Sequence, residues 1–122
     1  MTDRELLELA AKASGIDLHF RKALMPKDPD VPCYLDVNSV GESNHPYWQP
    51  VIRWNPLTDD GDALRLAVEL KFEIFCGEDQ SEVKDYEQTF VIIEEHKDHE
   101  SPVSATRRAI VRAAAEIGKE MP

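Results

Sequence analysis

The sequence predicts an α+β domain in which a mainly antiparallel sheet of four or five strands and three helices form a layered α/β/α sandwich. Two observations support this fold class. Segments with apolar residues at helical spacing stand near both ends and in the middle of the chain, and the segments between them alternate apolar and polar residues. A chain of 122 residues favours a single domain spanning residues 1–122.

The N-terminal region predicts one helix followed by one strand. Thr2 and Glu5 have the spacing of a capping box at the start of a helix over Thr2–Ser14, and Gly15 is typical of a helix end. Ile16–Lys22 then alternates apolar and polar residues, which indicates a half-buried strand.

The region that follows predicts two loops around a second strand. Proline and aspartate mark Met25–Pro32 as a loop, and Val31–Val37 is a strand whose early proline restricts pairing or places it at an edge. The loop Asn38–Pro50 holds Tyr47 and Trp48 between two prolines. These aromatic residues can form a stacking platform for a ligand or partner, or a hydrophobic lid over the core, and we favour the lid.

The stretch Trp54–Leu70, WNPLTDDGDALRLAVEL, is the most distinctive part of the sequence, and the short strand Val51–Trp54 leads into it. An Asn-Pro turn is followed by an acidic cluster that contains good N-cap residues, and then by an apolar helix. A carboxylate in the first helical turn also interacts favourably with the helix dipole. Because only two positions of the helix proper are clearly polar, we expect it to be mostly buried. The residues of interest are Trp54, Asn55, Thr58, Asp59, Asp60 and Asp62.

Two interpretations of this acidic cluster remain open. The aspartates can cap and solubilise a core helix, which we favour, or they can contribute to a ligand or partner site together with the aromatic loop. Three carboxylates at a helix start do not by themselves bring their oxygens to one point, so we predict no metal site there.

The second half of the chain predicts a hairpin followed by a long helix. Lys71–Cys76 and Tyr86–Glu95 read as strands joined by a polar turn at Gly77–Asp85, and they most simply pair as an antiparallel hairpin. The next segment, His96–Glu100, has a His-x-x-His spacing that can bind zinc or nickel weakly. We interpret it as a solvated loop and predict no metal.

The last helix is predicted over Ser101–Gly118, with Ser101 as its cap and Pro102 in its first position. Arg107 and Arg108 fall in its first two turns, where the helix dipole disfavours positive charge. We therefore expect them to meet carboxylates such as the Asp59–Asp62 cluster or to be solvated, rather than to bind an anionic ligand.

Composition narrows the classes of function. The net charge of −10 disfavours direct binding to nucleic acid, because the phosphate backbone would be repelled. Apolar runs are too short to span a membrane, and the acidic N-terminus is unlike a signal peptide. We expect Cys33 and Cys76 to be buried free thiols, which fits a reducing cytoplasm, whereas a disulfide between them would require their strands to be neighbours.

The stretches WNPLTDDGDALRLAVEL and SPVSATRRAIVRAAAEIG together resemble the phage ABA sandwich domain family of small phage and prophage proteins. The C-terminal helix resembles the A-x-x-A-I-x-x-A-A pattern of that family through Ala105, Ala109-Ile110 and Ala113-Ala114. The resemblance covers Trp54 to Gly118 well and the N-terminal helix and strand more loosely, while the Met25–Pro50 segment departs from it. It implies a layered helix–sheet–helix domain, an accessory role in a bacterial host, and no catalytic residues.

Three functions are compatible with these observations. The favoured hypothesis is a non-enzymatic protein that binds a host protein or a small ligand without a cofactor. A small hydrolase acting on a phosphorylated or nucleotide substrate, and an acidic mimic of nucleic acid that antagonises a host protein, are the alternatives. A strand edge or the aromatic loop can also pair two copies in a homodimer. The candidate site residues are Tyr47, Trp48, Trp54, Asn55, Asp59, Asp60, Asp62, Arg107 and Arg108.

Overall fold

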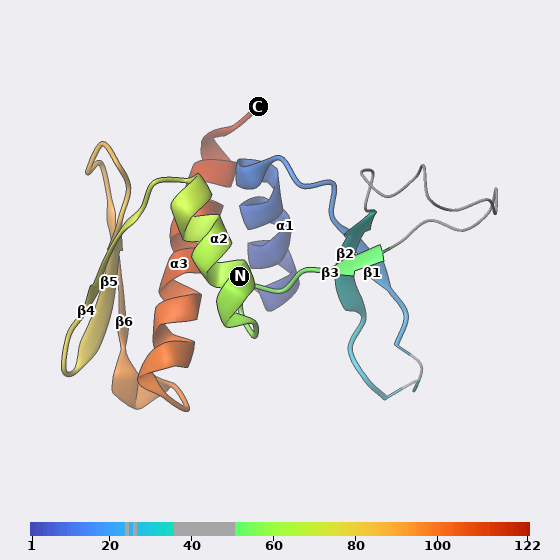
Figure 1. The fold of residues 1–122 in the computed structure, drawn as a ribbon, viewed down its shortest axis with the longest axis horizontal. Coiled ribbons are helices and arrows are strands. Elements are labelled where there is room, and N and C mark those ends of the chain that lie inside the picture. Colours follow the sequence, from blue (N-terminus) through green and yellow to red (C-terminus); the bar gives the residue numbers. More distant parts are fainter. Residues whose placement is uncertain (24, 26, 36–50) are drawn as a thin grey trace. The chain divides into compact units, whose positions relative to one another are not determined.

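The computed structural model describes residues 1–23, 25, 27–35 and 51–122. The chain forms two compact units. The helical unit consists of Met1–Ile16 and Asn55–Pro122, and the strand unit consists of Asp17–Trp54. The described residues contain three α-helices and two three-stranded antiparallel sheets, which confirms the α+β class (Figure 1).

The helical unit is built around its last helix. It contains the helices α1 (Asp3–Ser14), α2 (Asp60–Glu69) and α3 (Pro102–Glu120), the strands β4 (Glu73–Cys76), β5 (Gln80–Lys84) and β6 (Val91–Glu95), and the short 3-10 helix η2 (His96–Asp98). Helix α3 packs against α1, α2, β5 and β6, as Figure 1 shows. Its buried face is mostly alanine, so neighbouring elements can approach its backbone closely.

The helix ends follow the local chemistry of the sequence. The hydroxyl of Thr2 accepts a hydrogen bond from the amide of Glu5 at 3.1 Å, and Gly15 adopts the left-handed conformation with φ of 76°. Ser101 caps α3 by accepting from the amide of Ser104, and Pro102 occupies the first turn. These predicted caps are confirmed.

Gly118 has a different role from the predicted helix end, because α3 continues to Glu120. A Cβ atom at Gly118 would lie 2.1 Å from the backbone oxygen of Leu9 in α1. That distance is far inside van der Waals contact, so glycine is needed here for the close approach of the two helices.

The sheet of the helical unit corrects two predictions. Strand order is β4-β5-β6, with Phe75 opposite Glu82 and Glu82 opposite Ile93. The central strand β5 falls within the segment that was predicted to be a turn, and β6 is shorter than predicted. The predicted hairpin is therefore wrong, because the two expected strands each pair with β5 and not with each other.

The two faces of this sheet differ. One face meets α3 and carries buried or half-buried side chains, apart from the exposed Cys76 at the end of β4, whereas the opposite face carries the exposed apolar residues Phe75, Val91 and Ile93. Since side chains alternate along each strand, every residue facing α3 has neighbours facing away. The residues on the α3 side are Ile74, Cys76, Ser81, Val83, Ile92 and Glu94. The single sheet of four or five strands is thus replaced by two smaller sheets, and α3 covers one face of this one.

The strand unit contains β1 (His19–Arg21), β2 (Val31–Leu35) and β3 (Val51–Arg53) in the antiparallel order β1-β2-β3. Arg21 lies opposite Val31, and Cys33 lies opposite both His19 and Arg53. Cys33 is buried as predicted, with 3% of its surface exposed.

Cys76 is exposed, so the prediction that both thiols are buried is wrong for this residue. It is the last residue of β4, an edge strand of its sheet. Both cysteines are free. No helix in the described part of the chain is both long enough and apolar enough to cross a membrane.

Candidate functional site

The aromatic candidates do not contribute to a describable site. Tyr47 and Trp48 lie outside the described residues. Trp54 belongs to the strand unit, where its amide donates a hydrogen bond to the carbonyl oxygen of Pro32 at 3.1 Å. Only 5% of its surface is exposed.

Two of the three candidate carboxylates form hydrogen bonds at the start of α2. The side chain of Asp59 accepts a hydrogen bond from the amide of Asp62 at 2.8 Å, which makes Asp59 the N-cap. Asp62 accepts from the amide of Asn55 at 2.9 Å and from the guanidinium of Arg65 at 2.8 Å. Both carboxylates therefore hold the turn before α2, as the capping interpretation predicted.

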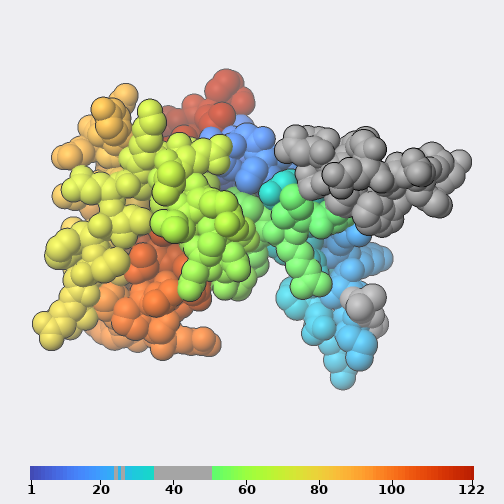
Figure 2. All heavy atoms as spheres, viewed as in Figure 1, coloured from blue at the N-terminus to red at the C-terminus, as the bar shows by residue number. Residues whose placement is uncertain are grey.

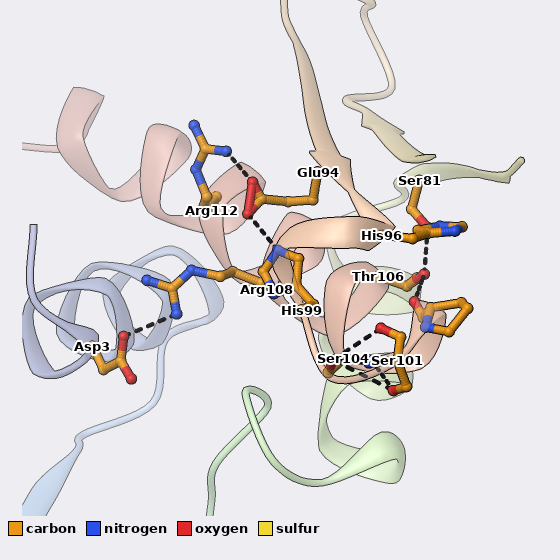
Figure 3. A network of polar contacts seen from close by, with 11 residues as sticks. Asp3, Ser81, Glu94, His96, His99, Ser101, Ser104, Thr106, Arg108 and Arg112 are labelled. Carbon is orange, nitrogen blue, oxygen red and sulfur yellow. Dashed lines mark hydrogen bonds and ion pairs between the residues drawn. The ribbon is translucent and has the colours of Figure 1, made fainter. Parts of the chain in front are cut away.

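The third carboxylate, Asp60, connects α2 to α3. Its Oδ1 lies 2.6 Å from a guanidinium nitrogen of Arg107, and the Nε of Arg107 donates to the carbonyl oxygen of Leu57 at 2.8 Å. Arg107 thus pairs with the acidic cluster as predicted. Arg108 pairs instead with Asp3 in α1, at 3.0 Å (Figure 3).

A groove of about 390 Å³ lies where α2, β4, β5 and α3 meet, and we call it the apolar groove. In Figure 2 the first half of α3, in orange, is seen between α2 in yellow-green and β4 in yellow. Leu64 and Val103 line the groove and are 60% and 50% exposed. The full lining consists of Asp60, Ala63, Leu64, Ile74, Cys76, Gly77, Ser81, His96, Pro102, Val103, Thr106, Arg107 and Ile110.

A chain of hydrogen bonds lies in the wall of the groove. The hydroxyl oxygen of Ser81 lies 2.9 Å from Nε2 of His96 and 2.7 Å from the hydroxyl oxygen of Thr106, as Figure 3 shows. Nδ1 of His96 lies 3.1 Å from the carbonyl oxygen of Glu78, and the hydroxyl oxygen of Thr106 lies 2.8 Å from the carbonyl oxygen of Pro102. Ser81 is fully buried.

This chain can satisfy His96 in either protonation state. A neutral imidazole donates from Nδ1 to Glu78 and accepts at Nε2 from Ser81, whose oxygen accepts from Thr106. A charged imidazole donates from both nitrogens, so Ser81 accepts from Nε2. The hydroxyl of Ser81 then donates to Thr106, and the hydroxyl of Thr106 donates to the carbonyl oxygen of Pro102. Every proton has an acceptor in both arrangements.

Ser81 and His96 have the separation of a nucleophile and its base, but their surroundings argue for a structural role. A nucleophile must reach its substrate, whereas Ser81 is fully buried and has both a histidine and a threonine as hydrogen-bond partners. We therefore interpret the pair as a link between β5, η2 and α3.

A second polar cluster joins β6 to α3. The carboxylate of Glu94 lies 3.1 Å from Nε2 of His99 and 2.7 Å from the guanidinium of Arg112 (Figure 3). Glu94 and His99 are each 15% exposed. The interpretation of residues 96–100 as a solvated loop is therefore wrong for both histidines, which are bound to different partners. Three or more potential metal-ligating side chains do not gather anywhere among the described residues.

The candidate residues do not assemble the arrangement that the hydrolase hypothesis requires. That hypothesis needs two carboxylates and an arginine in one pocket, as a base or metal site with an anion-stabilising group. Of the candidates that the structure describes, Asp60 and Arg107 line the groove. Each is the other's ion-pair partner.

The apolar groove was not predicted, because α2 was expected to be mostly buried. Leu64 and Val68 are instead 60% and 68% exposed. Both lie beside the buried helical stripe rather than within it, and apolar residues at such flanking positions were the available signal. The sequence could not place Ile74 of β4 and Val103 of α3 at the same groove, because that depends on tertiary packing.

Comparisons with known proteins add no family. No protein-family model matches the chain, and neither a curated protein nor a solved structure matches it.

Proposed function

We propose that this chain is a non-enzymatic binding protein that takes an apolar part of a small ligand or of a host protein into the apolar groove. The observation that carries the proposal is the groove itself, a hollow of about 390 Å³ whose exposed lining surface is mostly apolar. Small-molecule sites are typically lined by apolar side chains with a few polar groups that set orientation.

The polar groups around the groove support binding rather than catalysis. Asp60 and Arg107 neutralise each other, and Ser81, His96 and Thr106 form one satisfied chain. A ligand would gain its affinity mainly from apolar surface removed from water, at about 25 cal/mol per Å². Leu64 and Val103 expose apolar surface at the rim and would be covered by it.

The resemblance of the two distinctive stretches to small phage and prophage proteins supports a wider setting for this binding. In that setting the chain is a phage or prophage accessory protein that acts in the cytoplasm of the bacterial host. A partner in the host then presents an apolar side chain or a small bound molecule to the groove.

The acidic-mimic alternative receives less support from the strand register. It requires the carboxylates between Glu78 and Glu100 to lie along one face. Glu94 faces α3 and binds His99 and Arg112, whereas Glu82 and Glu95 lie on the other face of the sheet. The acidic residues are therefore divided between two faces.

The test uses two exposed apolar residues of α2 that differ in their relation to the groove. Leu64 lines the groove, and Val68, one turn later, does not. Indole serves as a neutral apolar probe, titrated into ¹⁵N-labelled protein. We expect saturable shifts of the amides of Ala63, Ile74 and Ile110. Leu64→Ser should weaken binding about fivefold through lost apolar contact, while Val68→Ser should leave it unchanged.

A capture experiment from host lysate, with native mass spectrometry of the eluate, extends the test to natural partners. A partner or small molecule that is retained by the Val68→Ser protein and lost by the Leu64→Ser protein would support the groove. Indole shifts scattered over the whole chain, or equal loss with both variants, would contradict it.

A further inference from the structure

The sheet of the strand unit gathers positive charge on one face. Because side chains alternate along a strand, the register places Arg21, Cys33 and Arg53 on the same face, with Val31 and Val51. A pocket of about 270 Å³ opens on this face. We call it the basic pocket, and its lining consists of Arg21, Lys22, Ala23, Val31, Cys33, Val51 and Arg53.

The cations of this pocket lack acidic partners in the part of the chain that the structure describes. Arg21, Lys22 and Arg53 are all exposed, and none of them pairs with a described carboxylate. The histidine on the same face, His19, is the residue that has an acidic neighbour, Asp17 at 3.2 Å. No carboxylate of the described strand unit therefore forms an ion pair with these three cations.

The two arginines are placed to converge on one ligand. They lie on the outer strands, on either side of β2, and their strand positions differ by two residues. Strands are about 4.8 Å apart and rise about 3.4 Å per residue, which puts the two Cα atoms roughly 12 Å apart. Two extended arginine side chains can span that separation and meet above Cys33 and Val31.

The chemistry of the lining selects the ligand. Arginine binds phosphate and carboxylate through a planar fork of two parallel hydrogen bonds, and lysine adds a point charge. Three cations balance a phosphomonoester, with a charge near −2, better than a carboxylate with a charge of −1. The buried Cys33 and the half-buried Val31 and Val51 provide an apolar floor for a small organic group.

The acidity of the whole chain does not oppose such a ligand. The strand unit contains four Lys and Arg residues and five Asp and Glu residues, so its net charge is −1 of the total −10. Screening limits interactions between exposed charges to about 8 Å at physiological ionic strength. The distant acidic residues of the helical unit are therefore largely screened from an anion in the pocket.

We propose that the basic pocket binds a small phosphomonoester, with Arg21 and Arg53 holding the phosphate and the apolar floor contacting its organic group. The pocket shares no residue with the apolar groove. This proposal and the proposed function can therefore fail independently.

Phenyl phosphate is the probe, titrated into ¹⁵N-labelled protein at low salt. We expect saturable shifts of the amides of residues 20–23, of Val31 and Cys33, and of residues 51–53, and no shifts along α2 and α3. Arg53→Gln should weaken binding about tenfold, because a charge-assisted hydrogen-bonded contact is lost. The matched control is Lys27→Gln, which removes one positive charge from the same unit outside the pocket lining and should change the affinity less than about twofold.

Three further comparisons sharpen the result. The double variant Arg21→Lys, Arg53→Lys keeps both positive charges but removes the paired hydrogen bonds of the two guanidinium groups. It should weaken the binding of phenyl phosphate more than Lys27→Gln does. Benzoate should bind more weakly than phenyl phosphate, and equal affinity would overturn the phosphate assignment. Tighter binding of a short single-stranded oligonucleotide would overturn the assignment to a small molecule. No saturable shift, or equal losses for Arg53→Gln and Lys27→Gln, would overturn the site.

Discussion

The two units use the same residue type differently. All five arginines of the helical unit, Arg4, Arg65, Arg107, Arg108 and Arg112, pair with a carboxylate. The two arginines of the strand unit pair with none of the carboxylates that the structure describes. An arginine that is paired with a carboxylate helps to hold two parts of the fold together. An arginine without such a partner can bind an anionic ligand. The net charge of the whole chain conceals this contrast.

The largest expected loss of stability comes from removing a buried hydroxyl in the helical unit. Ser81→Ala leaves Thr106 and His96 without their shared partner at a fully buried position. We expect the free energy of unfolding to fall by about 2 kcal/mol. Urea denaturation followed by far-UV circular dichroism measures this, because all described helices lie in the helical unit.

A double variant provides the control for that measurement. Adding Thr106→Val to Ser81→Ala removes both hydroxyls, so its cost should be smaller than the sum of the two single costs. A loss below about 0.5 kcal/mol for Ser81→Ala would be no larger than for an ordinary surface change and would contradict a structural role for the chain.

The next effect compares one arginine from each unit directly. Arg112→Gln removes the guanidinium from Glu94, whose side chain is 15% exposed, and should cost about 1 to 2 kcal/mol of stability. Arg53→Gln removes an exposed side chain without a described acidic partner, and should change stability by less than about 0.5 kcal/mol. The same denaturation experiment measures both variants. Equal losses of stability for the two variants would contradict the claim that arginines stabilise the fold in the helical unit but not in the strand unit.

A smaller effect separates two neighbouring aspartates of the helical unit. Asp59→Ala removes the N-cap of α2 and should cost about 1 kcal/mol. Asp60→Ala removes one side of an ion pair whose carboxylate is 73% exposed, and should cost at most about 0.5 kcal/mol. If thermal unfolding ranked the two variants in the opposite order, the capping role of Asp59 would be wrong.

The smallest effect concerns Asp85, a carboxylate that hydrogen bonds stabilise. Burial raises its pKa, but hydrogen bonds from the Thr89 side chain and from the amides of Phe90 and Thr89 together lower the pKa below its ordinary value. Its contribution to stability is therefore present above the unfolded pKa and is lost as the pH falls through the folded pKa. The stability difference between the native chain and Asp85→Asn should shrink as the pH is lowered below about 4. A difference that stays constant over that range would contradict the assignment.

Local features of the fold could be predicted from the sequence, and non-local ones could not. The caps Thr2, Asp59 and Ser101 were predictable, because each acts on an amide within three residues. Strand β5, QSEVK, was missed, because one of its two buried residues is a serine and its pairing partners lie elsewhere in the chain. The apolar pattern that marks a half-buried strand is therefore incomplete in this segment.

The contacts of the candidate site residues were also predictable only in part. The pairing of Arg107 with the acidic cluster was predicted, because an arginine near a helix start needs a compensating charge. The role of His96 was not predicted, because Ser81 lies 15 residues from it, and the link from Glu94 to Arg112 was not predicted, because these two residues are 18 apart. The basic pocket was missed for a further reason. Its two arginines come from strands that become neighbours of β2 only in the folded sheet.

The most direct test of the account observes the Nε–Hε groups of all seven arginines by NMR, with and without phenyl phosphate. The account predicts that the signals of Arg21 and Arg53 shift, while those of the five arginines in the helical unit stay in place because carboxylates already hold them. The opposite pattern, with Arg107 or Arg112 shifting and Arg21 and Arg53 unchanged, would contradict the division of roles between the two units.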